Sequence, residues 1–506
     1  MRLGSAMRLL VLGILVAMPA MPLGTAASPG VTTRVSVDSA GNQGNRVSVW
    51  PDISADGRFV AFSSSSSNLV PQDTNGTSDV FVHDRQTGET TRVSVDSTGN
   101  QWYRESSYPL SISADGRYVA FASANLAPGG IWEVFVHDRQ TGETTRVSVD
   151  SSGNQAFASS EQPAISDDGR YVAFRAVWGT KNHIFVRDRV MGITTSMSVD
   201  SAGNLGNGGS AYPAISADGR YVAFSSFASN LVPGDTNTCG IINCADVFVH
   251  DRQTGETTRV SVDNMGNQGN GESNDQVSIS ADGRFVAFSS FSSNLILGDT
   301  STCGGYSEPG ECQDIFVHDR QTGETTRVSV DSAGNKADLF SAHPAISADG
   351  RYVAFFSPAS NLVPEEANYR ADGFVRDRQA GETTRVSVDG AGNPGNDWSD
   401  YPAISADGRY VAFSSLADNL VPGDTNDSDD IFVHDRGPAV PTPTPSPPPG
   451  VGGAVKLPPA AIAAESGVQA EGSGWSGGAY AALAVGLSAA AAALGVGGWY
   501  ARKRLL

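Results

Sequence analysis

The run ISADGRFVAFSS at residues 53–64 recurs with few changes from residues 112, 165, 215, 279, 346 and 404, so that seven copies stand 50 to 67 residues apart. Each copy continues into a run such as DVFVHDR (residues 79–85), then a QTGET turn and a TTRVSVD run. The Asp-Gly pair inside the first run and the Thr-Gly pair after the second are typical of hairpin turns, because glycine accepts a positive φ. Each unit therefore predicts four short antiparallel strands, which are the segment ending in Ile-Ser, the RFVAFSS run, the VFVHDR run and the TTRVSVD run.

A repeat of four strands is typical of a propeller blade, since a lone sheet cannot bury both faces but blades stacked around an axis can. A VTTRVSVDS run at residue 31 stands before the first complete unit, and the seventh unit ends at DIFVHDR without such a run. We therefore predict an all-β, seven-bladed β-propeller over residues 31–437, in which the N-terminal strand completes the last blade and removes the free sheet edge.

The ISADGRYVAF and DIFVHDRQTGETTRVSV units resemble the TolB-like, WD-repeat-like propeller repeats of bacterial exported proteins. Those repeats carry Ser-Pro-Asp-Gly at the first turn, where this sequence has Ala or Asp in place of Pro. The resemblance covers residues 31–436 and implies the propeller fold. Members of that family commonly act as protein-binding platforms, so the resemblance also implies a binding role.

The two ends of the chain carry a different composition. Residues 1–27 combine two arginines, a short apolar run and small residues, which predicts a signal peptide, with an uncleaved anchor as the alternative. Residues 438–476 are rich in Pro, Gly and Ala and predict an extended stalk. Residues 477–500 carry no charge and are long enough for one transmembrane helix, with a peripheral helix as the alternative.

The basic tail at residues 501–506 predicts a cytoplasmic C-terminus and an exported propeller at the cell membrane. A stripe of small residues at every fourth position of the apolar segment, Gly478 to Ala490, would suit a homodimer through the transmembrane helix, although such stripes also arise by chance in Ala-rich helices. The net charge of −20 argues against nucleic acid and favours cationic partners in general.

Three sets of residues are candidates for structural or metal-binding roles. Five of the seven histidines occupy one repeat position that holds Arg187 and Arg376 in the other two blades, so we expect them to be structural and to pair with neighbouring acids. The cysteines lie in two inserted loops of an exported chain and predict two local disulfides, with zinc as the alternative. They are Cys239 with Cys244, and Cys303 with Cys312.

An acid-x-Asn-x3-Asp pattern recurs in the loops between the second and third strands. Its hard oxygen atoms suit calcium, and Asx-turns before a strand would explain the same residues. The copies are Asp73, Asn75 and Asp79; Glu366, Asn368 and Asp372; and Asp424, Asn426 and Asp430.

The long, variable loops of a propeller with this repeat all emerge on one face, and variable loops on a rigid scaffold commonly bind ligands. The aromatic residues expected there, some of which would instead fill gaps between blades, are Trp50, Trp102, Tyr103, Trp178, Tyr306 and Trp398. We predict a non-enzymatic propeller that binds an extracellular protein or glycan through this face. The alternatives are an exported hydrolase or lyase with its site at the central channel, and a structural envelope protein.

Overall fold

The structure is a computed structural model that describes residues 30–438, except for residues 104, 125–130, 237, 240–241, 274, 298–312 and 365–369. For residues 107–108, 238–239 and 242–243 it describes the backbone alone. The predicted signal peptide, the stalk beyond residue 438, the apolar segment and the tail lie outside this range. In the described part of the chain, no helix has the length and apolar character needed to cross a membrane.

Seven four-stranded antiparallel sheets form the blades, and in six of them all neighbouring strands follow the order of the chain. Blades 1 to 3 contain β2 (Ser48–Ile53), β3 (Phe59–Ser64), β4 (Asp79–Asp84) and β5 (Thr90–Arg92); β6 (Ser106–Ile112), β7 (Tyr118–Ser123), β8 (Glu133–Asp138) and β9 (Glu143–Arg146); and β10 (Ser160–Ile165), β11 (Tyr171–Trp178), β12 (Lys181–Asp188) and β13 (Ile193–Ser196). Blades 4 and 5 contain β14 (Ser210–Ile215), β15 (Tyr221–Ser226), β18 (Asp246–Asp251) and β19 (Thr257–Arg259); and β20 (Val277–Ile279), β21 (Phe285–Ser290), β22 (Asp314–Asp319) and β23 (Glu324–Arg327). Blades 6 and 7 contain β24 (Ala342–Ile346), β25 (Tyr352–Ser357), β26 (Asp372–Asp377) and β27 (Glu382–Arg385); and β28 (Ser399–Ile404), β29 (Tyr410–Ser415) and β30 (Asp430–Asp435).

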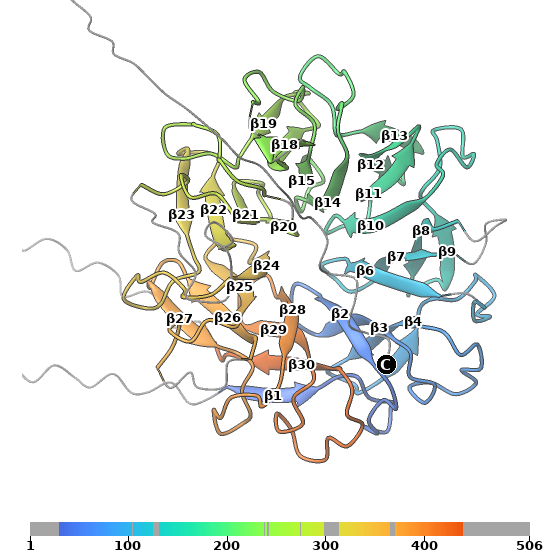
Figure 1. Ribbon diagram of the computed structural model, residues 1–506. Helices are drawn as coiled ribbons and strands as arrows, with labels where there is room; N and C mark the ends of the chain where they lie inside the picture. The colour runs from blue at the N-terminus through green and yellow to red at the C-terminus, as the bar shows by residue number, and fades with distance from the viewer. Residues whose placement is uncertain are drawn as a thin grey trace, which may run out of the picture.

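The N-terminal strand β1 (Val31–Arg34) closes the ring, as the repeat predicts. It pairs antiparallel with β30, with Val31 opposite Asp435 and Arg34 opposite Phe432, and so becomes the outer strand of blade 7. Figure 1 shows this blue strand beside the orange strands of the last blade. The first strands of neighbouring blades contact one another all around the axis, from β2 through β28 and back to β2. The fold is therefore a closed seven-bladed propeller with its first strands around a central channel.

The hydrophobic core lies between neighbouring blades. Val80 and Val82 of blade 1, for example, pack in one cluster with Val119, Phe121 and Phe135 of blade 2. This follows from the sequence pattern, because both faces of the second and third strands are apolar and each face needs a neighbouring blade to cover it.

The first turn of each repeat requires a glycine for two reasons: its φ is positive, and an aromatic ring of the neighbouring blade leaves no room for a side chain. Gly116 has a φ of 71°. A Cβ atom built there would overlap the ring of Phe59 from the preceding blade. The glycine thus lets an aromatic ring of one blade pack directly against the backbone of the next.

The two faces of the ring differ. The turns between first and second strands and between third and fourth strands are short, and we call their side the turn face. The loops between second and third strands and the connections between blades form the opposite side, which we call the loop face. The two loop classes contact each other there, for example through Gln43 Nε2, which donates to Asp424 Oδ1 over 2.6 Å. Because β1 begins and β30 ends at the turn face, the chain enters and leaves the ring there.

Candidate functional site: the mouth of the central channel

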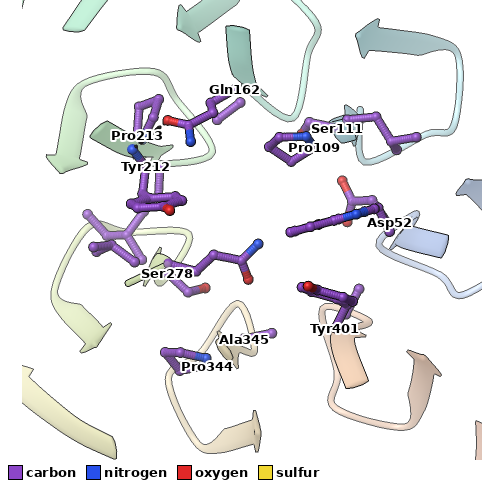
Figure 2. A pocket seen from close by; sticks show the side chains of 18 of the residues that line it. Asp52, Pro109, Ser111, Gln162, Tyr212, Pro213, Ser278, Pro344, Ala345 and Tyr401 are labelled. Carbon is purple, nitrogen blue, oxygen red and sulfur yellow. Dashed lines mark hydrogen bonds between the residues drawn. The ribbon is translucent and has the colours of Figure 1, made fainter. Parts of the chain in front are cut away.

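A cavity of about 310 Å³ lies on the axis of the ring and is lined by the first strands of all seven blades. Its wall is mostly proline, alanine and isoleucine. The larger and polar side chains of the lining are Trp50, Asp52, Gln162, Tyr212, Gln276 and Tyr401. Figure 2 shows Asp52, Gln162, Tyr212 and Tyr401 arranged around one open centre. A concave wall on which a few polar side chains converge is a common form of a ligand site.

An unusual backbone conformation places side chains at this mouth. In five blades, the residue before the inner-strand proline has a positive φ of 51° to 57°, at Trp50, Gln162, Tyr212, His343 and Tyr401. A β-bulge occurs at the same point, since Val49 pairs with Ser63 and Asp52 with Ala61. Blade 5 has Val277 where the others have proline, and its inner strand pairs without a bulge. Positive φ values at non-glycine residues cost of order 1–3 kcal/mol each and tend to cluster at functional sites.

The side chains from blades 1, 7 and 6 stack against one another. The rings of Trp50 and Tyr401 have centroids 3.7 Å apart, and the rings of His343 and Tyr401 are 4.6 Å apart and nearly parallel at 17°. His343 also lies 5.0 Å from Phe356 behind it. One side of the mouth is therefore a continuous row of aromatic rings.

Carboxylates from blades 5 and 7 flank the histidine of blade 6. His343 Nδ1 lies 2.8 Å from Asp400 Oδ1, and His343 Nε2 lies 3.5 Å from Asp275 Oδ1. Burial opposes a charge on this ring, but the two carboxylates outweigh it and raise the pKa of His343. A further ion pair joins Arg175 to Glu161 at 3.3 Å. The mouth thus carries three acids at one repeat position, Glu161, Asp275 and Asp400, each with a basic partner.

Asp52 stands deeper in the channel and differs from these acids. Its Oδ2 accepts a hydrogen bond from the backbone N–H of Ile112 in the next blade, and its Oδ1 accepts one from Ile53, both at 2.9 Å. Burial raises the pKa of Asp52 to about 6, although these hydrogen bonds and one from Ser111 oppose the shift. Asp52 is the one charged residue among those that line the described cavity.

The aromatic residues predicted for the loop face fall into different places. Trp50 lines the channel. Tyr103, Trp178 and Trp398 lie on the loop face with exposures of 80%, 46% and 42%. Trp102 is only 2% exposed and packs against Phe121 and Phe135, which corrects its assignment to the binding surface, because it fills the gap between two blades. Tyr306 lies outside the described residues.

The predicted calcium loops hold an arginine where the ion was expected. Arg92 Nη1 lies 3.4 Å from both Asp73 Oδ1 and Asp79 Oδ2, and Asn75 donates to Asp79 Oδ2 over 2.8 Å. The backbone N–H of Thr77 donates to Asn75 Oδ1 over 3.1 Å, which is the Asx-turn alternative.

The copy in blade 7 repeats this arrangement. Arg34 lies 3.3 Å from Asp424 and 3.4 Å from Asp430, and the backbone N–H of Ser428 donates to Asn426 over 3.0 Å. Asp372 has Arg385 at 3.6 Å, whereas Glu366 and Asn368 lie outside the described residues. Within the described part of the chain, no three or more His, Cys, Asp or Glu side chains are placed so that they could hold a metal ion.

The predicted disulfides lie largely beyond the described side chains. Cys239 lies in β16 (Thr238–Cys239), which pairs with β17 (Ile242–Asn243) to form a small hairpin on the loop face. Cys244 follows directly and is buried at 1% exposure. Cys303 and Cys312 lie outside the described residues. Both pairings therefore stay predictions.

The repeated histidines are structural, but their partners are hydroxyl groups and not acids. His137 Nδ1 lies 2.9 Å from Thr144 Oγ1, and that hydroxyl donates to the carbonyl of Val95 in the preceding blade over 2.6 Å. Because the hydroxyl proton goes to the carbonyl, His137 Nδ1–H must be the donor to Thr144. The same link recurs at His83, His250, His318 and His434.

Most of the distinctive residues of the channel belong to no motif that the sequence pattern predicts as a site. Tyr401, Tyr212, His343 and Asp52 all belong to a short x-Pro-x-Ile segment, which in five units leads into the ISADGR run. Variation could have identified them, because this segment differs between units whose neighbouring segments are nearly invariant.

The ring and its channel define the class of protein as a closed, seven-bladed β-propeller with a lined axial cavity. No protein-family model matches the sequence, and no curated protein matches it either. The structure is similar to TolB from Acinetobacter baumannii, at 14% identity over 78% of this chain and 81% of that one, with a TM-score of 0.36.

Two further solved structures extend this comparison. Oligogalacturonate lyase from Vibrio parahaemolyticus is 11% identical over 80% of this chain and 93% of its own, with a TM-score of 0.47. The β-propeller domain of the trilobed protease from Pyrococcus furiosus is 12% identical over 81% and 95%, with a TM-score of 0.45. At these identities the likeness concerns the propeller fold alone.

Proposed function

We propose that this protein is an exported propeller, held at the cell membrane by residues 477–500, that binds an extracellular protein or glycan at the mouth of its central channel. The observation that carries the proposal is the departure from the repeat at that mouth. Among the described side chains, nearly identical units present tryptophan, glutamine, tyrosine and histidine there, five of them in a strained backbone conformation. A purely structural ring would have no need to keep such a costly and varied set of residues on its axis.

The course of the chain supports an outward-facing mouth. Both ends of the propeller leave from the turn face, where Val31 pairs with Asp435. A stalk and membrane helix that follow residue 438 would therefore hold the turn face nearer the membrane. The loop face, with the channel mouth, would then be free for a partner outside the cell.

Ligand capture by the full-length protein tests this proposal. The purified protein in a non-ionic detergent would be screened against peptide and glycan arrays, beside Trp50→Ala and Trp398→Ala. We expect Trp50→Ala to lose the captured ligand and Trp398→Ala to retain it, because Trp398 is an exposed tryptophan of the same face that does not line the cavity. Loss with Trp398→Ala alone would move the site to the outer loops, and capture that neither change affects would reject the channel site.

One observation favours the enzyme alternative, an exported hydrolase or lyase. Asp52 in the channel has its pKa raised to about 6, and a carboxyl group with such a pKa can hold or release a proton near neutral pH. Assays on glycoside, ester and peptide substrates with the wild-type protein and Asp52→Ser test this alternative. Turnover that depends on Asp52 would favour the enzyme over the binding protein.

A further inference from the structure

We propose that the channel binds an organic cation, namely the ammonium or guanidinium group of a lysine or arginine side chain on a partner protein, with Asp52 as its counter-ion. This inference rests on the proposed binding function of the channel mouth and names the chemical class of its ligand.

The first argument is that Asp52 lacks the partner that similar carboxylates in this protein have. The acids that start the third strands are buried, and each is paired with an arginine. The pairs are Asp79 with Arg92, Glu133 with Arg146, Asp246 with Arg259, Asp314 with Arg327, Asp372 with Arg385, and Asp430 with Arg34. Among the described residues, no lysine, arginine or histidine forms an ion pair with Asp52, so the cation that would balance it has to come from outside.

The second argument is that the fold itself does not need a charge at this position. The carboxylate of Asp52 accepts a hydrogen bond from the Ile112 N–H of the next blade. In blades 2 and 5 the same link is made by a neutral hydroxyl, since Ser111 accepts from Ile165 N–H over 3.3 Å and Ser278 from Ile346 N–H over 3.1 Å. The remaining blades have alanine at this position. Serine would therefore serve the ring equally well, and the negative charge has another use.

The third argument is the surroundings of the charge. Trp50, Tyr212 and Tyr401 line the cavity, and aromatic faces attract cations. The cavity wall contains no lysine or arginine among the described residues that could repel a cation. Asp52 lies two residues further along the strand than Trp50, which places it roughly 5–7 Å deeper. That depth suits the four-carbon stem of a lysine side chain that enters from the loop face.

A comparison of two isosteric probes tests the charge. The full-length protein would be titrated with N-acetyl-arginine amide and with N-acetyl-citrulline amide, its neutral counterpart, by saturation-transfer NMR and calorimetry. We expect the arginine probe to bind about tenfold more tightly or better, as a charge-assisted hydrogen bond is worth about that factor. Equal binding of the two probes would overturn the cation while the binding site stood. Binding of neither probe would also overturn it, and the array screen with Trp50→Ala would then decide the binding function separately.

Two matched variants locate the effect. Asp52→Ser reproduces the residue that blade 2 uses, so the fold should be retained, and the preference for arginine should fall to about that of citrulline. Glu89→Gln removes the same charge from the exposed turn face and should leave binding unchanged. Preference for arginine that persists in Asp52→Ser would refute the role of Asp52. If that variant does not fold, Tyr401→Leu tests the aromatic wall instead, with an expected loss of about fivefold or more.

Discussion

Replacement of one repeated histidine should make the propeller less sensitive to acid. His137 is buried, and burial lowers its pKa to about 4, from an ordinary value of about 6.5. Its hydrogen bond to Thr144, which in turn donates to Val95, links two blades. A histidine with a lowered pKa stabilises the fold above pH 6.5, and this contribution is lost as the pH falls toward 4, because the unfolded chain takes up the proton first.

The expected magnitude follows from these two pKa values. At about pH 5 the histidine is protonated in the unfolded chain and neutral in the folded one. This difference lowers the free energy of unfolding by about 2 kcal/mol relative to its value at about pH 7. His137→Gln removes this proton uptake while a glutamine amide can still donate to Thr144. The variant should therefore lose about 2 kcal/mol less of its free energy of unfolding than the wild type between the two pH values.

Urea denaturation of the full-length protein, followed by tryptophan fluorescence at both pH values, measures this difference. His343→Gln is an internal control of opposite sign. The carboxylates of Asp275 and Asp400 raise the pKa of His343 above that of the unfolded chain, so its contribution is present at low pH and is lost as the pH rises. This variant should lose more stability than the wild type on acidification. An unchanged pH response in His137→Gln would refute the reasoning that the repeated histidines are held neutral by burial.

Three further predictions follow from the fold. Gly116→Ala should destabilise the protein by about 3 kcal/mol in denaturant titrations, because it combines backbone strain with overlap of the Phe59 ring. Gly142 has a similar φ but open space around it, so Gly142→Ala should cost only about 1 kcal/mol. Deletion of residues 30–36 should lower the melting temperature and cause association in size-exclusion chromatography, because β30 becomes a free edge; a monomeric, equally stable deletion would contradict the closure. Calcium or a chelator should leave the melting temperature unchanged, whereas Arg92→Gln should cost about 3 kcal/mol by stranding two carboxylates.

The architecture of this protein could be predicted because its determinants are local and repeated. Turn glycines such as Gly116 and the strand-forming runs recur in every unit, and the missing strand at one end matches the spare one at the other. Seven copies of the same weak signal make one strong signal.

The site depends on relationships that no single repeat contains. Trp102 reads as a loop residue, and only the neighbouring blade's Phe121 and Phe135 show that it is core. Arg92 enters the predicted calcium loop because strand pairing brings it there from a later strand. The side chains of the channel face one another across the whole ring, and their direction follows from a bulge that the residue pattern does not reveal.

The pairing of β1 with β30 also has a consequence for how the molecule assembles. Residues 31–34 are made early, and their partners at residues 432–435 follow some four hundred residues later. Contacts of such high sequence separation form slowly, because the entropy of closing a long loop has to be overcome first. The ring must therefore remain open until β30 has been made. This order would suit the export that we propose for this protein, since a ring that cannot close early is easier to thread across a membrane as an open chain.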